Sequence, residues 1–276
     1  MVTNSTALLL LIPLLIGVIN LIVPLFLRKL LTFLGIGFNL FLTVLLYSQS
    51  PQSISLFGEL VFSTDRLGIL AITFIQLLSF LILIFALKSV NPKIEKSFFI
   101  LYPLTLFFCN GVVLSDHIFS FIIFWGMSGL ALYAFGLLGE STKASITAKK
   151  TFIIIGGSDA FLIMGLVLMW LLKAQDTWSL SNMQIPIEGG LAIIAFIFLL
   201  IAAFAKAGGF PFHTWVPDFC RDAPIESAAY LPASLDKLLG IYLLTRMMTT
   251  LFSINILINM IVISLGALTV ITAVMM

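Results

Sequence analysis

Long apolar runs follow one another along the whole chain, and short polar stretches separate them. About 20 apolar residues are enough for a helix to cross the ~30 Å hydrocarbon core of a bilayer. The pattern therefore predicts an all-α polytopic membrane protein with about nine transmembrane helices. The predicted spans are residues 7–27, 30–48, 67–88, 97–115, 117–138, 150–173, 189–220, 224–248 and 253–275.

The composition agrees with this class and excludes several others. Hydrophobic residues make up 61% of the chain and charged residues 9%, against about 45–50% and about 25% in soluble globular domains. A net charge of +2 provides no basic surface for nucleic acid. The two cysteines, Cys109 and Cys220, exclude a disulfide scaffold, and no cysteine or histidine spacing indicates a metal or cofactor site. We expect no cofactor, and the lipid bilayer is the expected surrounding.

The basic residues predict which side of the membrane each loop faces. Four alternate loops carry nine of the lysines and arginines, whereas the opposite ends of the spans carry three, Arg66, Lys173 and Arg246. Loops rich in lysine and arginine stay on the cytoplasmic side. The N-terminus is therefore expected to lie outside.

Three ionisable residues lie well inside predicted spans, namely Asp159, Lys206 and Lys237. A charge at this depth costs about 2.5–3.5 kcal/mol on insertion scales, and such residues commonly mark ion pathways. A structural ion pair or a lysine that snorkels to the interface is the alternative interpretation.

Two predicted helices contain a proline close to one of these lysines. After Lys206, the glycines Gly208 and Gly209 and the proline Pro211 predict that span seven breaks. Pro232 interrupts span eight five residues before Lys237. Broken membrane helices are tolerated where protein or water satisfies the freed backbone, and ion translocators use them for binding sites.

His213 follows the first break. It either relays protons or binds a freed backbone carbonyl, and the sequence leaves both readings open.

Residues 205–244 resemble the signature of antiporter-like membrane subunits. This family includes proton-translocating subunits of respiratory complex I, of membrane-bound energy-converting hydrogenases and of multisubunit cation/proton antiporters. The matching residues are Lys206, Pro211, His213, Thr214, Trp215, Pro217, Asp218 and Lys237. The resemblance implies proton translocation through Lys206, Lys237, Asp159, His213 and Asp236, and an inner (plasma) membrane or an equivalent energy-transducing membrane.

The chain departs from the family pattern in two respects. The family has a glutamate directly after the helix-five tryptophan, but Gly126 follows Trp125 here. The family also has two inverted five-helix repeats, whereas this chain is expected to contain one, at residues 97–248. Three leading helices in residues 1–96 precede the repeat, and one helix in residues 249–276 follows it. The chain is therefore expected to be either a shortened or split subunit, whose second repeat is supplied by a separate chain, or a degenerate paralogue.

The resemblance implies a membrane subunit of a redox-driven complex that contributes a proton or sodium half-channel. Other membrane-arm subunits and hydrophilic redox subunits are the implied partners, and this chain itself is expected to be non-catalytic. The alternative is a structural subunit that seals or scaffolds the membrane arm without pumping. A free-standing carrier of a small solute is a third reading.

Lys206 needs a counter-charge other than a helix-five glutamate. Asp159 and Asp236 are the acidic residues buried in the same repeat, and we expect at least one to lie within hydrogen-bonding reach of a lysine. Asp236 points about 100° away from its neighbour Lys237 on a helix. Asp159 is therefore the first choice for Lys206.

Overall fold

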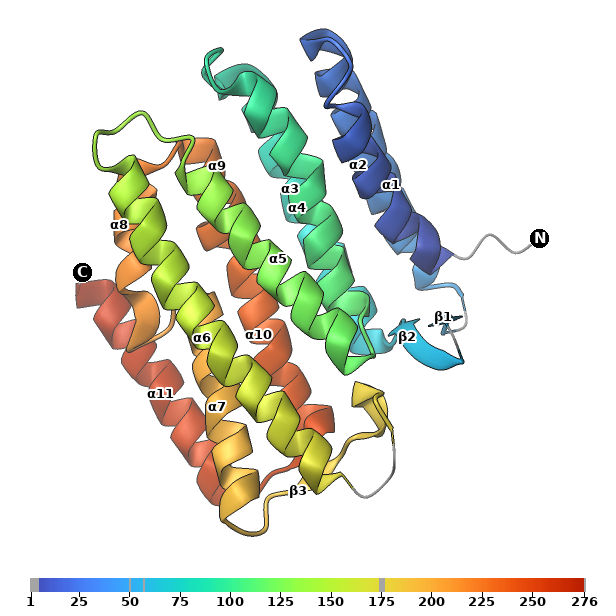
Figure 1. Ribbon diagram of the computed structural model, residues 1–276, viewed down its shortest axis with the longest axis vertical. Helices are drawn as coiled ribbons and strands as arrows, with labels where there is room; N and C mark the ends of the chain where they lie inside the picture. Colours follow the sequence, from blue (N-terminus) through green and yellow to red (C-terminus); the bar gives the residue numbers. More distant parts are fainter. Residues whose placement is uncertain (1–4, 50, 57, 174–176, 276) are drawn as a thin grey trace.

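The computed structural model describes residues 5–49, 51–56, 58–173 and 177–275, and these form a bundle of long helices (Figure 1). The helices are α1 (Ser5–Ile19), α2 (Leu25–Leu46), α3 (Arg66–Ser89), α4 (Glu95–Leu114), α5 (Ile118–Gly136), α6 (Ala144–Leu172), α7 (Gly190–Ala207), α8 (Trp215–Asp222), α9 (Ile225–Tyr230), α10 (Asp236–Arg246) and α11 (Ile256–Met275). In Figure 1, α1 and α2 form one edge of the bundle and α11 the other, so the two ends of the chain lie on opposite sides.

The all-α polytopic prediction is confirmed in its coarse form. Within the described residues, α7 with α8 and α9 with α10 each correspond to one predicted span, so nine helical segments match the nine predicted spans. Seven helices are long and apolar enough to cross a membrane, with α7 and α8 counted as one. α1 is apolar but has only 15 residues.

The boundary between the first two helices differs from the prediction. α1 ends at Ile19 and α2 begins after Pro24, because a proline lacks the N–H that a continuing helix would use. Two basic residues expected in the connecting loop therefore lie in the first turn of α2. Arg28 is buried and donates from Nε to the carbonyl of Val23, 2.8 Å away, and Lys29 pairs with Glu95.

Two stretches expected as loops contain short strands. β1 (Ser53–Leu56) and β2 (Glu59–Ser63) form an antiparallel ribbon. β3 (Ile185–Pro186) pairs in parallel with β4 (Phe252–Ser253), within the first residues of the expected ninth span. The hydrogen bonds of these strands pair backbone N–H and C=O groups in the connections between the helices.

The helix expected to break at Pro232 stays helical from Ile225 to Leu251. Its backbone is π-helical at Leu231–Leu235, around the proline, and again at Met247–Leu251. A π turn widens the helix and relieves the clash between the proline ring and the preceding turn. Pro232 therefore interrupts the α-helical hydrogen bonding but not the course of the helix.

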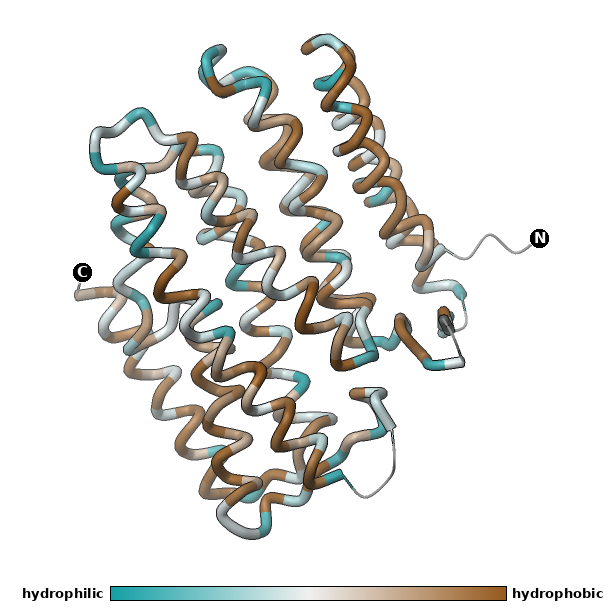
Figure 2. The backbone as a smooth tube through the Cα atoms, viewed as in Figure 1, coloured by the Kyte–Doolittle hydropathy of each residue, from teal (hydrophilic) through white to brown (hydrophobic). Residues whose placement is uncertain are grey.

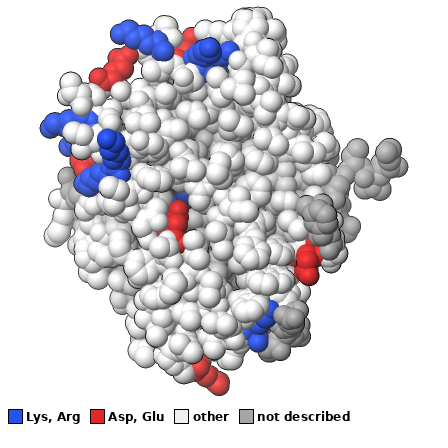
Figure 3. All heavy atoms as spheres, in the orientation of Figure 1, with Lys and Arg blue, Asp and Glu red and all other residues white. Residues whose placement is uncertain are grey.

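Polar and charged residues are distributed as a membrane-spanning bundle requires. Figure 2 shows hydrophilic residues mainly at the helix ends and connections, with long hydrophobic stretches between them. In Figure 3 the charged side chains gather at the two ends, and the middle of the face is uncharged except for a small patch with an acidic and a basic side chain. The large apolar side chains exposed along the helices, such as Phe26, Ile153 and Val270, suit contact with lipid or with other subunits.

A close helix crossing fixes the position of the central charges. A Cβ added at Gly240 of α10 would lie 2.6 Å from both the carbonyl oxygen of Ala203 and the amide nitrogen of Ala207 on α7. Only a glycine permits this backbone approach. The contact holds the last turn of α7 against the first turn of α10.

We expect Gly240→Ala to destabilise the protein by about 1–3 kcal/mol, because the added methyl group forces α7 and α10 apart. The measurement is the thermal unfolding midpoint of the detergent-solubilised protein. Gly126→Ala is the matched control, since a Cβ at Gly126 meets no atom within 4 Å. Equal midpoints for the two variants would contradict the close crossing.

Candidate functional site

Lys206 lies in the last turn of α7, where that helix ends inside the bundle. α7 stops at Ala207, directly after the lysine, as the glycine and proline residues predict. Gly208 has φ +69°, a left-handed conformation that glycine adopts without strain, and the N–H of Gly209 donates to the carbonyl of Phe204. Lys206 therefore belongs to the last turn of α7, where the negative end of the helix dipole favours a positive charge.

The ammonium group of Lys206 is fully enclosed by three helices. Its side chain has zero exposure and donates from Nζ to Ser128 Oγ of α5 at 2.7 Å. Nζ also lies 3.5 Å from Asp236 Oδ1 of α10 and 5.2 Å from the centre of the Trp125 ring. A hydroxyl, a carboxylate and an aromatic face thus replace the water that a lysine normally holds.

A second carboxylate adjoins this group from α6. Asp159 Oδ1 accepts a hydrogen bond from Trp125 Nε1 at 2.8 Å. A Cβ built at Gly129 would lie 3.7 Å from Asp159 Oδ2 and 3.9 Å from Lys206 Nζ, so both charged groups border the space that this glycine leaves. We call Trp125, Ser128, Asp159, Lys206 and Asp236 the Lys206 centre.

The expected pairing of Lys206 with a buried carboxylate is confirmed, but Asp236 rather than Asp159 makes the ion pair. Asp236 is buried at 0% exposure, whereas Asp159 is partly exposed. Successive side chains on a helix point about 100° apart. Asp236 therefore faces α7, and its neighbour Lys237 faces away from α7. Neither carboxylate oxygen of Asp236 has a hydrogen-bond donor among the described residues.

Lys237 and His213 lie apart from the Lys206 centre. Both line a cavity of about 160 Å³ that we call the α8 cavity. Its other lining residues include Gly208, Pro217, Thr269 and Thr272. The side chain of Lys237, which the sequence placed deep inside a span, is exposed on this side of α10.

The hydrogen bonds at the break bear on the two interpretations of His213, as a proton relay or as a partner of a freed backbone carbonyl. The carbonyl of Ala205 accepts hydrogen bonds from Trp215 Nε1 at 3.1 Å and from the N–H of Gly208 at 3.2 Å, so it does not need His213. His213 stacks on Phe210, and its Nδ1 is buried with no hydrogen-bond partner among the described residues. Pro211 follows a cis peptide bond and introduces the short turn at Phe212–Thr214 that leads into α8.

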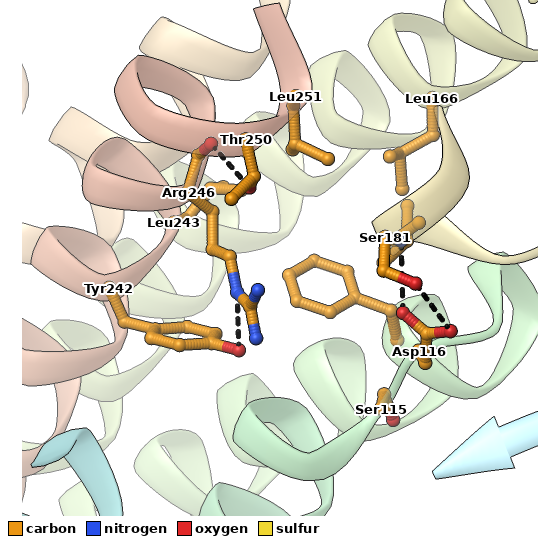
Figure 4. A pocket seen from close by; sticks show the side chains of 11 residues that line it. Ser115, Asp116, Leu166, Ser181, Tyr242, Leu243, Arg246, Thr250 and Leu251 are labelled. Carbon is orange, nitrogen blue, oxygen red and sulfur yellow. Dashed lines mark hydrogen bonds between the residues drawn. The ribbon is translucent and has the colours of Figure 1, made fainter. Parts of the chain in front are cut away.

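Sequence reasoning missed Ser128, which lies three residues after Trp125. Residues at this spacing lie on one helix face, and that signal would have found the contact. It also missed a polar cluster at the other end of α10. There Arg246 forms an ion pair with Asp65 of 2.8 Å. Its Nε also donates to the Tyr242 hydroxyl at 2.9 Å (Figure 4).

Asp116 lies near this cluster, across a small cavity. It accepts hydrogen bonds from the backbone N–H and the hydroxyl of Ser181, at 3.0 and 3.1 Å (Figure 4). The cavity between Asp116 and Arg246 has about 20 Å³, which suits one water molecule. Over the described part of the chain, no group of three or more His, Cys, Asp and Glu could hold a metal ion.

Comparison with known proteins agrees with this geometry. A family model described as NADH:quinone oxidoreductase/Mrp antiporter, TM, matches residues 115–276, which hold the whole Lys206 centre. The chain belongs to this family and is a multi-pass integral membrane protein.

Among related proteins, one component of the Na(+)/H(+) antiporter of Alkalihalophilus pseudofirmus is 28% identical over 192 residues, which are 66% of this chain and 23% of that protein. A chain of the membrane-bound sulfane sulfur reductase, an archaeal respiratory membrane complex, matches with a TM-score of 0.77 and 20% identity, over 91% of this chain and 54% of its own length. A chain of respiratory complex I from Thermus thermophilus matches with a TM-score of 0.74 and 20% identity, over 88% and 52%. These solved structures support the antiporter-like fold. The present chain spans about half of their length and less than a quarter of the antiporter component.

We expect Lys206→Met and Asp236→Leu each to destabilise the protein by about 3–5 kcal/mol, because each leaves one buried charge without its partner. The double variant removes both charges and is expected to recover most of that loss. Thermal unfolding of the four detergent-solubilised proteins measures this coupling. Additive losses in the double variant would contradict the ion pair.

Proposed function

We propose that this chain is a subunit that translocates ions across the membrane as part of a multisubunit, redox-driven complex, and that the Lys206 centre is its charge-carrying site. One observation carries the proposal. A lysine at zero exposure lies between two carboxylates at the point where a membrane helix breaks. Its ion pair with Asp236 alone would serve a structural role, but the second carboxylate gives the site a charge imbalance.

The imbalance follows from counting the charges. With Lys206, Asp236 and Asp159 all ionised, the centre carries a net charge of −1. A net charge is costly away from water, and a bound proton neutralises it. The centre can therefore hold one extra proton and release it when a neighbouring charge changes, which is the basic step of a proton half-channel.

The α8 cavity would provide a route for protons on one side of the Lys206 centre. Water in the α8 cavity would contact His213 and Lys237. That cavity adjoins Gly208 in the break, two residues from Lys206. Proton passage would then use His213, Lys237 and the Lys206 centre, while Gly208, Gly209, Pro211 and the π turn at Pro232 shape the backbone around them.

The remaining parts of the proposal concern the assembly. Residues 97–248 would form one five-helix repeat, with the N-terminus outside. Hydrophilic redox subunits would supply the energy. The resemblance to chains of a complex I and of a sulfane sulfur reductase supports a redox-driven complex in an energy-transducing membrane. The match to a component of a Na(+)/H(+) antiporter keeps sodium as an alternative to the proton.

One observation favours the alternative of a non-pumping structural subunit. Gly126 occupies the position of the family's helix-five glutamate, and a side chain there would meet nothing within 4 Å. The space is empty, so no other group has taken the place of that carboxylate on α5. A transport assay distinguishes the two functions.

We expect Lys206→Ala to abolish ion translocation or to reduce it at least about tenfold, because the centre loses the charge that its carboxylates balance. Translocation is measured as ions moved per electron transferred by the host complex in sealed vesicles. Lys149→Ala is the matched control, since Lys149 is an exposed lysine near the start of α6.

Assembly of the complex is checked in the same preparations, because a variant that fails to assemble would also fail to transport. Unchanged ions per electron in an assembled Lys206→Ala complex would contradict the proposal and support the structural role.

A further inference from the structure

The α8 cavity holds an ammonium group without a counter-charge. The ammonium group of Lys237 has no ion pair or hydrogen bond among the described residues, although its side chain lies near the middle of a membrane helix. His213 lines the same cavity. A positive charge at this depth requires an anionic or hydrogen-bond-accepting neighbour.

The chain itself supplies no such neighbour in the described part of the cavity. Thr269 and Thr272 of α11 form its opposite wall, and neither carries a charge. The Thr269 hydroxyl already accepts from the N–H of Phe210 at 3.1 Å and donates to the carbonyl of Leu265. The lining therefore has a positive side and a neutral side, and no acidic side chain.

The cavity is accessible to another chain because α11 covers it loosely. Ile258 is the only residue of α11 that is buried among those described. The cavity itself, at about 160 Å³, has room for a carboxylate group and accompanying water. The exposed apolar side chains of α11, such as Ile263 and Val270, suit contact with a further transmembrane helix beside this face.

We propose that the α8 cavity receives the carboxylate of an aspartate or glutamate from a transmembrane helix of a partner subunit, which pairs with Lys237. The inference rests on the proposed membership of a multisubunit complex, and it adds the docking site and the chemistry of the partner. The carboxylate balances the one lysine that the bundle leaves unpaired at this depth among the described residues.

The pairing is tested by zero-length crosslinking in the assembled complex. The membrane-permeant reagent dicyclohexylcarbodiimide activates a carboxylate, which then couples to a lysine amine only if the two groups are in contact. Mass spectrometry of the digested complex identifies the coupled peptides. The expected product joins Lys237 to an acidic residue in an apolar segment of another subunit. The contact of 2.5 Å between Lys150 and Asp218 is an internal control for the coupling.

Two variants of Lys237 distinguish its contact with the partner's carboxylate from its reactivity towards the activated carboxylate. Lys237→Arg keeps the charge but has no amine to couple, so the complex is expected to assemble without the crosslink. Lys237→Ala is expected to lose the crosslink and to lower the amount of chain in the native-size complex several-fold. The exposed Lys96→Ala is expected to leave both unchanged.

The proposal is overturned if Lys237 stays uncoupled while Lys150 and Asp218 couple, which would leave lipid or water in the cavity. It is also overturned if Lys237 couples to an acid of this same chain. The ion-translocation test of Lys206 is independent of both results. A crosslink together with normal transport in Lys206→Ala would contradict the proposed function but support the docking site. A missing crosslink together with lost transport in Lys206→Ala would contradict the docking site but support the proposed function.

Discussion

The arrangement of the central helices depends on one buried ammonium group, that of Lys206, which needs protein groups in place of water. Lys206 has no contact with solvent, so every interaction that water would provide must come from α5, α6 and α10. Lys206 lies in the last turn of α7, where the helix dipole favours a positive charge, Ser128 accepts its hydrogen bond, and Asp236 balances its charge. Gly240 allows α10 to come close enough to α7 for that balance.

The negative charges around Lys206 come from helices other than α5. Gly126 follows Trp125 on α5, and this helix contributes an indole and a hydroxyl. The negative charges come from the two helices on either side of the lysine, Asp159 on α6 and Asp236 on α10.

Much of the fold could be predicted from the sequence, because apolar length and proline and glycine positions act locally. The nine spans and the break after Lys206 follow from these signals alone. The first helix ends before the predicted residue 27, because Pro24 precedes the first residue of α2. The length of an apolar run does not reveal such a boundary. Pro232 was expected to break its helix, but a π turn accommodates the ring, and that choice depends on packing around the helix.

The composition of the site was harder to predict than its existence. The sequence identified Lys206, Asp159 and Asp236 as a group, but the choice between the two aspartates depends on how α10 is rotated against α7. It also placed Lys237 with the buried charges, although its side chain faces the α8 cavity. Rotation about a helix axis is set by tertiary contacts such as Gly240 against Ala203, and a single sequence does not encode it in any local pattern.

The central claim is that Asp236 supplies the counter-charge that ion translocation through Lys206 requires. Its most direct test is the number of ions moved per electron in Asp236→Leu, compared with the double variant Asp236→Leu and Gly126→Glu. Residue 126 shares a helix face with Gly129, which borders Lys206 Nζ, so a glutamate there points towards the centre. The account predicts that Asp236→Leu loses translocation and that the added glutamate recovers it. Native translocation in Asp236→Leu alone would contradict the account.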